Sequence, residues 1–163
     1  MARIDQKIGI VPSILDRLLD NEPANSREPV TNQFQSFRTL EASVARDLEL
    51  LLNTKQEALD ELPAEFAEVS RSLLTYGLPD FTIYSLDSID DRRRILRAVE
   101  QVIANFEPRL LNVRVAIEPP RDHDRGLRFR IEALLRVDPA PEPVTFDAML
   151  QLSTQEYVIH GRD

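Results

Sequence analysis

Residues 88–117, SIDDRRRILRAVEQVIANFEPRLLNVRVAI, contain the point at which this 163-residue chain changes from a helical to a strand pattern. Before Pro108 the apolar residues recur at the spacing of one helix face. They are Ile95, Leu96, Val99, Val102, Ile103 and Phe106. After Pro108 the apolar residues occupy every second position, which is the period of a strand. They are Leu111, Val113, Val115 and Ile117. The helix is predicted to begin at Ser88, which together with Asp91 three residues later resembles a capping box. Proline lacks an N–H and disfavours helical geometry at the residue before it, so the helix is predicted to end at Glu107.

The residues that follow continue the strand pattern. Leu127, Phe129 and Ile131 alternate with charged residues, which predicts a second strand that runs to about Val137. Residues 144–152 predict a third strand, and residues 157–159 either continue it or form a fourth. Consecutive strands joined by short breaks are most simply antiparallel. The edge of such a terminal sheet must be covered, charged or used for binding.

Two further helices are predicted before residue 88. Residues 36–52 have the i, i+4 rhythm, with Ser36 as a cap and Asn53 as an end; the apolar positions are Leu40, Val44, Leu48, Leu51 and Leu52. A helix is also predicted from Pro63 to about Thr75, followed by Gly77; its buried stripe would be Phe66, Val69, Leu73 and Leu74. Helices first and a small antiparallel sheet last define an α+β fold.

The sequence pattern of residues 1–35 predicts a separate N-terminal unit. Four apolar residues at helical spacing predict a short amphipathic helix: Ile14, Leu15, Leu18 and Leu19. Residues 21–35 are polar and predict a loop or flexible linker. We therefore expect residues 1–35 to form the helix and linker, and residues 36–163 to form the α+β domain. The helix has two open destinations, its own domain or a groove on a partner protein.

Composition excludes several classes of protein. The formal charge is −8, and the most basic stretch, residues 92–94, directly follows Asp90 and Asp91, so a nucleic-acid partner is not expected. No run of about 18 apolar residues is present, so membrane insertion is not expected. The absence of cysteine excludes disulfides and thiolate-bound metal. The N-terminus has no signal-peptide pattern, and we expect a cytoplasmic protein.

Few residues suggest catalysis. His123 and His160 fall in a predicted turn and in the tail, without sequence partners for a metal site or a triad. Four glycines leave no loop to cradle a phosphate, and we expect no cofactor and no small-molecule substrate. The alternative kept open is a peptidoglycan hydrolase that uses Glu107 as general acid. Its second carboxylate would come from Asp80, Glu118 or Asp122. A generic adaptor domain is a third possibility.

Three segments together carry a resemblance to a known family. They are SVARDLELLLNT at residues 43–54, YGLPDF at residues 76–81 and FEPRL at residues 106–110. In order and spacing they resemble the TssE family of type VI secretion baseplate proteins. That family is a branch of the contractile-phage baseplate wedge proteins historically labelled lysozyme-like. The resemblance covers roughly residues 11–152.

The resemblance implies a structural role and no enzymatic activity. Members of the family lie in baseplate wedges, contact other wedge subunits and join the baseplate to the first ring of the contractile sheath. The central spike or hub is a further candidate partner. The resemblance also implies that Glu107, Pro108 and Arg109 contact the sheath. From the residues alone a simpler interpretation stays open, in which Pro108 stops the helix and the two charges pair within the chain. The stripe of Ile14, Leu15, Leu18 and Leu19 is the second predicted interaction site.

Overall fold

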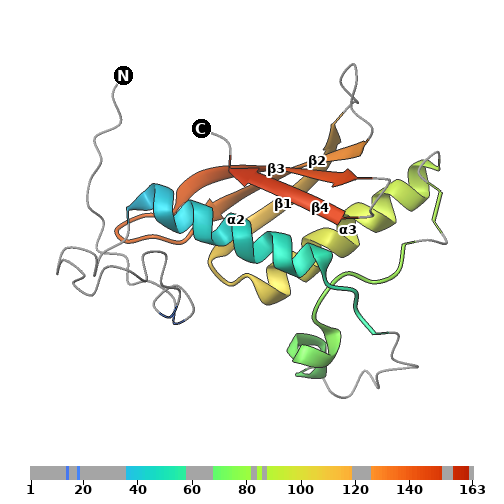
Figure 1. The fold of residues 1–163 in the computed structure, drawn as a ribbon, viewed down its shortest axis with the longest axis horizontal. Helices are drawn as coiled ribbons and strands as arrows, with labels where there is room; N and C mark the ends of the chain where they lie inside the picture. The colour runs from blue at the N-terminus through green and yellow to red at the C-terminus, as the bar shows by residue number, and fades with distance from the viewer. Residues whose placement is uncertain are drawn as a thin grey trace, which may run out of the picture.

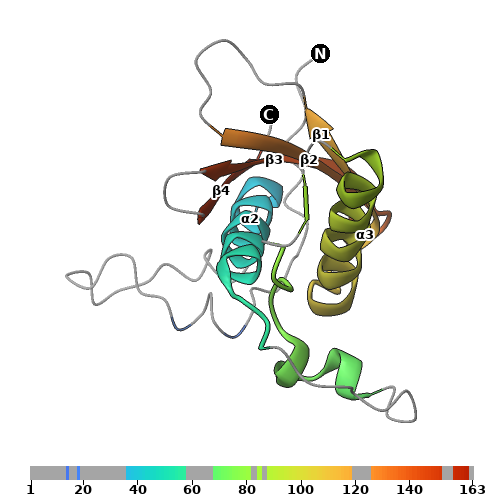
Figure 2. The same ribbon diagram turned by 90° about the vertical axis from the view of Figure 1, so that its right-hand side faces the viewer.

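The computed structural model describes residues 36–57, 68–81, 84–85, 88–118, 126–151 and 156–161, together with Ile14 and Leu18. Within these residues, two helices cover one face of a four-stranded antiparallel sheet (Figures 1 and 2). The helices are α2 (Phe37–Asn53) and α3 (Ile89–Phe106). The strands are β1 (Leu110–Glu118), β2 (Gly126–Leu135), β3 (Glu142–Gln151) and β4 (Glu156–Gly161), in the order β1-β2-β3-β4. The predicted α+β class is confirmed, and the open question at residues 157–159 is decided in favour of a fourth strand.

Both helices begin where the sequence predicts, because a serine hydroxyl accepts a hydrogen bond from the first turn. The N–H of Thr39 donates to Ser36 Oγ at 3.2 Å, and the N–H of Asp91 donates to Ser88 Oγ at 3.3 Å. Acidic residues in the first turn of α3 add a favourable interaction with the helix dipole. Helix α3 ends at Phe106, directly before Glu107 and Pro108, as expected.

The core lies between the helices and the inner face of the sheet. The predicted apolar stripe of α2 is buried throughout, and Ile95, Val99, Val102 and Ile103 are buried on α3. The sheet contributes alternate residues of β2, β3 and β4; among them are Phe129, Ile131, Phe146, Ala148, Tyr157 and Ile159. In the described residues, no helix is long and apolar enough to cross a bilayer.

A β-bulge shifts the pattern at the start of β1. Leu110 and Leu111 pair with Leu135 and Leu134, whereas Arg114 pairs with Glu132, so β1 has one extra residue at this point. Asn112 lies in the bulge with φ 54°, a left-handed conformation that asparagine tolerates. As a result Leu110 is buried, and the predicted alternation from Leu111 holds only beyond the bulge.

The helix predicted from Pro63 to Thr75 is wrong in its described part. Residues 69–75 form two separate 3₁₀ helices, η2 (Val69–Arg71) and η3 (Leu73–Thr75). The break lies at Ser72, whose hydroxyl donates to Val69 O at 2.8 Å and accepts from the N–H of Leu74 at 3.3 Å. Such local bonds compete with the helical ones. Leu73 and Leu74 are consequently exposed, not buried, and Phe66 lies outside the described residues.

Three other predictions meet the structure as follows. His160 lies in β4, opposite Asp147, and not in a loop-like tail. His123 and the linker at residues 21–35 lie outside the described residues. Gly77 has φ 105°, a left-handed conformation that glycine adopts readily after a helix. It ends no long helix, however; it leads into Leu78, whose N–H donates to Thr54 O at the exit of α2.

Candidate interaction site

The segment from Glu107 to Leu110 is a tight turn that joins α3 to β1. The N–H of Glu107 closes the last turn of α3 on Ile103 O at 2.8 Å, and the N–H of Leu110 donates back to Glu107 O at 3.1 Å. Pro108 takes the second position of this four-residue turn, where its fixed φ is favourable. The turn therefore places Glu107 and Arg109 side by side beneath α2.

Arg109 binds Glu107 through two parallel hydrogen bonds. Nε donates to Glu107 Oε1 at 2.6 Å and Nη2 donates to Oε2 at 2.5 Å. The backbone N–H of Arg109 also donates to Oε1, at 3.2 Å. Only 6 % of the Glu107 side chain is exposed, so its charge is held in a site that water hardly reaches. A bidentate guanidinium is the partner that best compensates such a buried carboxylate.

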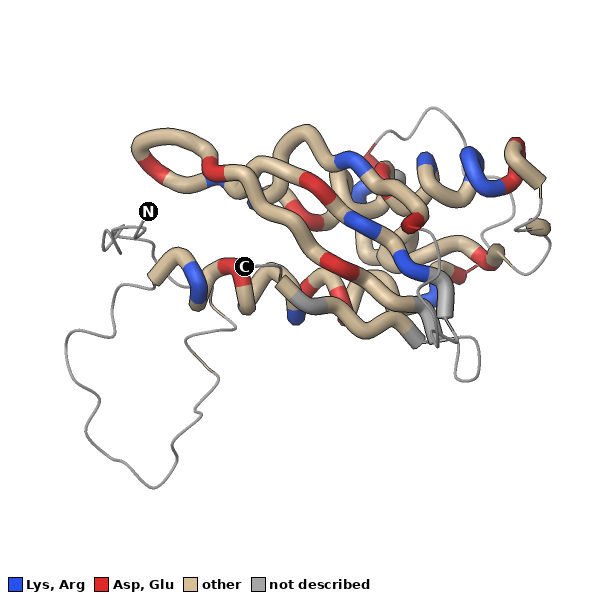
Figure 3. The backbone as a smooth tube through the Cα atoms, turned by 90° about the horizontal axis from the view of Figure 1, so that it is seen from above, with Lys and Arg blue, Asp and Glu red and all other residues tan. Residues whose placement is uncertain are grey.

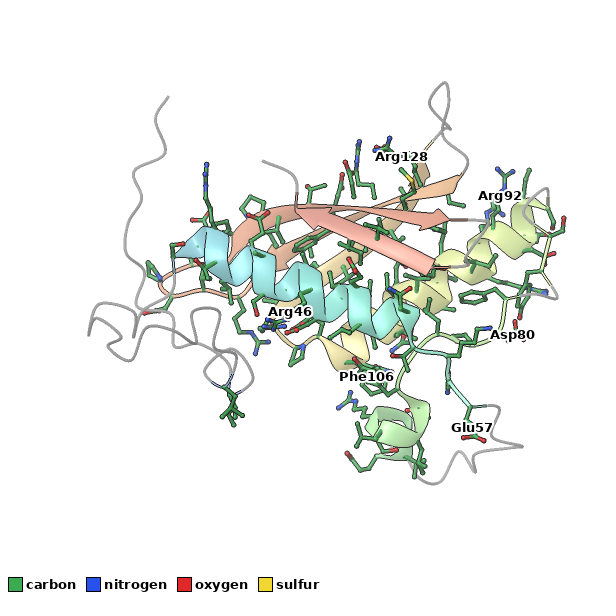
Figure 4. The ribbon with its side chains drawn as sticks, in the orientation of Figure 1. Arg46, Glu57, Asp80, Arg92, Phe106 and Arg128 are labelled. Atoms are coloured by element: carbon green, nitrogen blue, oxygen red, sulfur yellow. The ribbon has the colours of Figure 1, made fainter. Side chains whose placement is uncertain are left out.

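Helix α2 completes the network, which we call the Arg109 network: Ser43, Arg46, Asp47, Glu107 and Arg109. Arg109 Nη2 also donates to Asp47 Oδ2 at 2.6 Å, and Asp47 Oδ1 accepts from Arg46 Nη2 at 2.9 Å. Arg46 in turn lies 3.4 Å from the hydroxyl of Ser43. Figure 4 shows Arg46 projecting from the side of α2 that faces away from the sheet. Two positive and two negative groups balance, so the network ties the turn to α2 without adding net charge.

The electrostatics of the network follow from these contacts. Hydrogen bonding to Glu107 raises the pKa of Arg109 above its ordinary value, against the effect of burial, and Asp47 adds to the rise. Burial also raises the pKa of Tyr76, helped by the negative charges of Asp47 and Glu107. Arg109 is therefore a permanent cation and Tyr76 a neutral phenol at any physiological pH.

An open pocket of ≈ 430 Å³ lies beside the turn. Its lining residues come from α2, from the segment after η3, from the end of α3 and from the turn; they are Asp47, Leu50, Leu51, Tyr76, Phe106, Glu107, Pro108 and Arg109. Tyr76 and Phe106 pack edge to face, with ring centroids 5.2 Å apart. Leu50, in the last turn of α2, is 55 % exposed and lines this pocket. The pocket thus combines an apolar wall with the polar Arg109 network.

The predicted site residues occupy different environments. Glu107 is buried, Arg109 is largely engaged within the chain, and Pro108 is exposed. The structure therefore contains the internal pairing that the sequence left open, and the exposed part of the motif is Pro108 with the pocket. Ile14 and Leu18 are both helical and are 78 % and 75 % exposed, whereas Leu15 and Leu19 lie outside the described residues. An interaction role for these residues stays a prediction.

The geometry offers little to the hydrolase alternative. A general acid of this kind needs a carboxyl group in an apolar pocket, free to donate its proton. Both oxygens of Glu107 instead accept hydrogen bonds from Arg109. Glu118, one candidate partner, is paired with Arg130 on the sheet, and Asp122 lies outside the described residues. Within the described part of the chain, no three His, Asp or Glu side chains form a group that could hold a metal.

The sequence did not identify Asp47, Ser43, Arg46 or Tyr76 as site residues. The one signal for these residues in the sequence was their position in the chain. Ser43, Arg46 and Asp47 lie in the segment at residues 43–54, and Tyr76 lies in the segment at residues 76–81, both of which carry the family resemblance. Ser43, Arg46, Asp47 and Leu50 are also spaced three and four residues apart, which places them on one face of a helix.

A helical layer on a small antiparallel sheet, with a turn fixed by ion pairs beside an open pocket, defines the architecture of the site but no activity by itself. The family model of the baseplate wedge protein gp25 matches residues 38–140, more than half of the chain. The chain belongs to this family, and the resemblance to TssE drawn from the sequence is confirmed at this level. No curated protein and no solved structure matches the chain.

Proposed function

We propose that this protein is a non-catalytic baseplate wedge component of a type VI secretion system, which links the baseplate to the contractile sheath and initiates sheath assembly. Membership of the baseplate wedge family supports a structural role in a baseplate. The partners would be other wedge subunits, sheath subunits and the central spike or hub, and the site of action the cytoplasm.

The observation that supports the proposal is the turn from Glu107 to Leu110, which the Arg109 network holds in one conformation beside the pocket. The Arg109 network fixes Pro108, Phe106 and the rim of the pocket relative to α2. A preformed apolar pocket loses little conformational entropy when a partner side chain enters it. Glu107 and Arg109 would then act mainly by fixing the shape of this surface, and the contact itself would involve Leu50, Tyr76 and Pro108.

The test separates the contact surface from the network. Leu50→Asp places a charge in the pocket and removes a side chain that is 55 % exposed, so stability should fall by no more than about 1 kcal/mol. The matched control is Ile89→Asp, which is similarly exposed (60 %) but lies at the opposite end of α3 from Phe106 (Figure 1). Tagged variants are purified from the native cytoplasm and the bound proteins are identified by mass spectrometry.

Wedge and sheath proteins should be recovered with the native protein and with the Ile89 variant, and lost with the Leu50 variant. Equal recovery with all three would show that the pocket is not the contact surface. In parallel, the double substitution Glu107→Ala, Arg109→Ala should reduce sheath assembly in cells. Normal sheath assembly with that variant would mean that the motif only ends helix α3 and makes no contact with the sheath.

The N-terminal stripe is tested by deletion of residues 1–25. We propose that Ile14, Leu15, Leu18 and Leu19 dock on another wedge subunit, so the deletion should leave the thermal midpoint unchanged and abolish wedge co-purification. A large loss of stability would instead place this helix in the core of its own domain. Cell-wall hydrolysis by the purified protein, lost on Glu107→Gln, would favour the hydrolase.

A further inference from the structure

The large apolar side chains that are exposed among the described residues fall into three groups. One lies in the N-terminal segment, one on α2 and η3, and one at the start of α3. They are Ile14 and Leu18, then Leu50, Leu73 and Leu74, and finally Ile89. Two groups of more than one residue are therefore uncovered in the same chain.

The second group extends the pocket beside the Arg109 network. Leu50 and Tyr76 line the pocket, and η3 ends directly before Tyr76, whose N–H donates to Leu73 O at 3.3 Å. Leu74 is two residues from Tyr76, so their Cα atoms are at most about 7 Å apart. Figure 4 shows the short helical turns of residues 69–75 on the same side of the molecule as Phe106. We call these residues the pocket surface: Leu50, Leu73, Leu74, Tyr76, Phe106 and Pro108.

The pocket surface has the dimensions to receive one face of an amphipathic helix. Its volume of ≈ 430 Å³ lies in the range of clefts that enclose a bound ligand. Two side chains four residues apart on a helix share a face and are separated by about 6 Å along its axis, so Ile14 and Leu18 can enter together. Leu15 and Leu19 repeat this spacing in the sequence. This arrangement is the helix-in-groove mode of recognition.

The chain is long enough to bring these residues to the pocket surface of the same molecule. Fully extended, the chain between Leu18 and Ser36 spans about 60 Å. Leu50 lies about 21 Å along α2 from Ser36. A tether of this length sets an effective concentration on the order of 1 mM, so that even a weak contact is populated.

The outer face of the sheet is a poor alternative for the same residues. Figure 3 shows acidic and basic residues side by side on this face. Arg130 pairs with Glu118, and Arg128 pairs with Asp147 at 3.8 Å. Covering such pairs with leucines would cost the hydration of the charges. Within the part of the chain that the structure describes, the pocket surface is therefore the one apolar area that fits the N-terminal stripe.

We propose that in the free protein the N-terminal stripe covers the pocket surface of its own molecule, and that binding of the stripe to a wedge subunit uncovers it. The structure, in which Ile14, Leu18 and Leu50 are all exposed, corresponds to the uncovered state. Because the stripe and a sheath subunit compete for the pocket surface, the sheath binds well only after the wedge has taken the stripe. The order of assembly, baseplate before sheath, is then a property of this chain. The parts of the wedge and the sheath rest on the proposed function, and the covering does not.

The size of the effect follows from the covered fraction. If about four fifths of the free molecules are covered, the apparent affinity of the pocket surface for a partner is about fivefold lower, because only the uncovered fraction binds. A helix of this length is marginal near the temperature of unfolding, so the covering is lost before the domain unfolds. Deletion of residues 1–25 therefore still leaves the thermal midpoint unchanged.

Alkylation of single thiols by iodoacetamide tests the covering in the isolated full chain. The chain has no cysteine, so Leu50→Cys and Leu74→Cys each place one thiol on the pocket surface. The matched control is Ile89→Cys, because Ile89 and Leu74 are equally exposed at 60 % and Ile89 lies at the other end of α3 from Phe106. Addition of Leu18→Asp should speed alkylation about fivefold at positions 50 and 74 and leave position 89 unchanged. Unchanged rates at both positions of the pocket surface would overturn the covering.

The protein concentration shows whether the stripe acts within one molecule. Protection of the thiol at position 74 should be the same over an about hundredfold range of concentration, since docking within a chain does not depend on it. Protection that increases with concentration would assign the stripe to a second copy and overturn the contact within one molecule.

Sheath binding without wedge proteins tests the consequence. Purified sheath subunits should bind the Leu18→Asp variant about fivefold more tightly than the native chain, the same factor that alkylation reports. Equal affinity of the two proteins would overturn the control of sheath binding by the stripe, while the proposed function stands. Failure of the sheath subunits to bind either protein would overturn the proposed function, and the covering measured by alkylation would remain.

Discussion

The substitution Arg109→Met is expected to be strongly destabilising, although it keeps a long side chain at position 109. It removes both side-chain hydrogen bonds to Glu107 while the apolar part of the side chain is largely kept. The carboxylate of Glu107, 6 % exposed, then remains buried at the C-terminus of α3. Negative charge is unfavourable at a helix C-terminus because of the helix dipole, and only the backbone N–H of residue 109 still donates to the carboxylate.

The magnitude follows from the burial. Removing one partner of a buried ion pair costs about 3–5 kcal/mol, because the remaining charge is uncompensated. A quarter of the Arg109 side chain is exposed, which allows some water to approach and favours the lower end of this range. We therefore expect a loss of about 3 kcal/mol in the free energy of unfolding. For a domain of this size that loss lowers the thermal midpoint by about 6–12 °C.

Two controls identify the cause. Arg46→Met removes a more exposed partner of Asp47 from the same network and should cost less than about 1 kcal/mol. The double substitution Glu107→Leu, Arg109→Met removes the buried charge together with its partner and should be clearly less destabilising than Arg109→Met alone. Urea unfolding of the four proteins at pH 7, followed by circular dichroism, gives the free energies. A loss below about 1 kcal/mol for Arg109→Met, or a double variant at least as unstable as that single one, would refute the buried-charge explanation.

Three more predictions follow from individual contacts. Burial raises the pKa of Tyr157 to about 12, above the 10.0 expected of an unfolded tyrosine. Between these two pH values the folded form keeps the proton that the unfolded form loses. Stability should therefore fall by roughly 2–3 kcal/mol as the pH rises from 10 to 12. Unfolding of Tyr157→Phe over the same range should lack this fall; an unchanged fall would assign it to other groups. Asn53→Ala should cost about 1–3 kcal/mol in urea unfolding, because two backbone groups of β4 lose their partner; a neutral result would mean that water replaces the amide. Gly77→Ala should cost about 1–3 kcal/mol or more in thermal unfolding, since φ is 105° and a Cβ would lie 2.4 Å from Thr54 O; a loss under 0.5 kcal/mol would show that the segment shifts freely.

The elements that the sequence predicted correctly are those whose signals are local. The period change at Pro108 and the serine caps at residues 36 and 88 depend on neighbours within one helical turn, and all appear where expected. The alternation in β1 to β3 also sets which face is buried, because one face of the sheet is covered by helices. Such features need no knowledge of the rest of the chain.

The errors arise where two local interactions compete. The stretch at residues 69–75 has helical spacing, but Ser72 satisfies neighbouring backbone groups with its hydroxyl and interrupts the helix. Periodicity counts apolar positions and ignores this competition. The bulge at Asn112 is similar, since an asparagine in a left-handed conformation leaves the composition of a strand unchanged while it shifts the phase of the first two residues.

Only part of the site was predicted from the sequence. The residues of its motif are adjacent in the chain, whereas the residues that bind the motif are far away in the chain. Glu107, Pro108 and Arg109 are adjacent, but Asp47 is about 60 residues earlier in the chain, and no spacing rule connects them. Tyr157 is bound by Asn53 across a still longer separation. Contacts of this kind depend on how α2 lies against the sheet, which the sequence pattern of α2 alone does not specify.

The structure explains why the segment at residues 43–54 carries so much of the resemblance. Each side of α2 has a separate task. One face packs in the core through Val44, Leu48 and their neighbours, and a second face holds the turn at Arg109 through Asp47. The third closes β4 through Glu49 and Asn53. A helix that only covers a sheet can change its outer faces freely, but here a change on any face disturbs the core, the pocket or the edge of the sheet. The order of residues along α2 is therefore constrained on all three faces, because the same helix packs in the core, fixes the turn beside the pocket and covers the edge of β4.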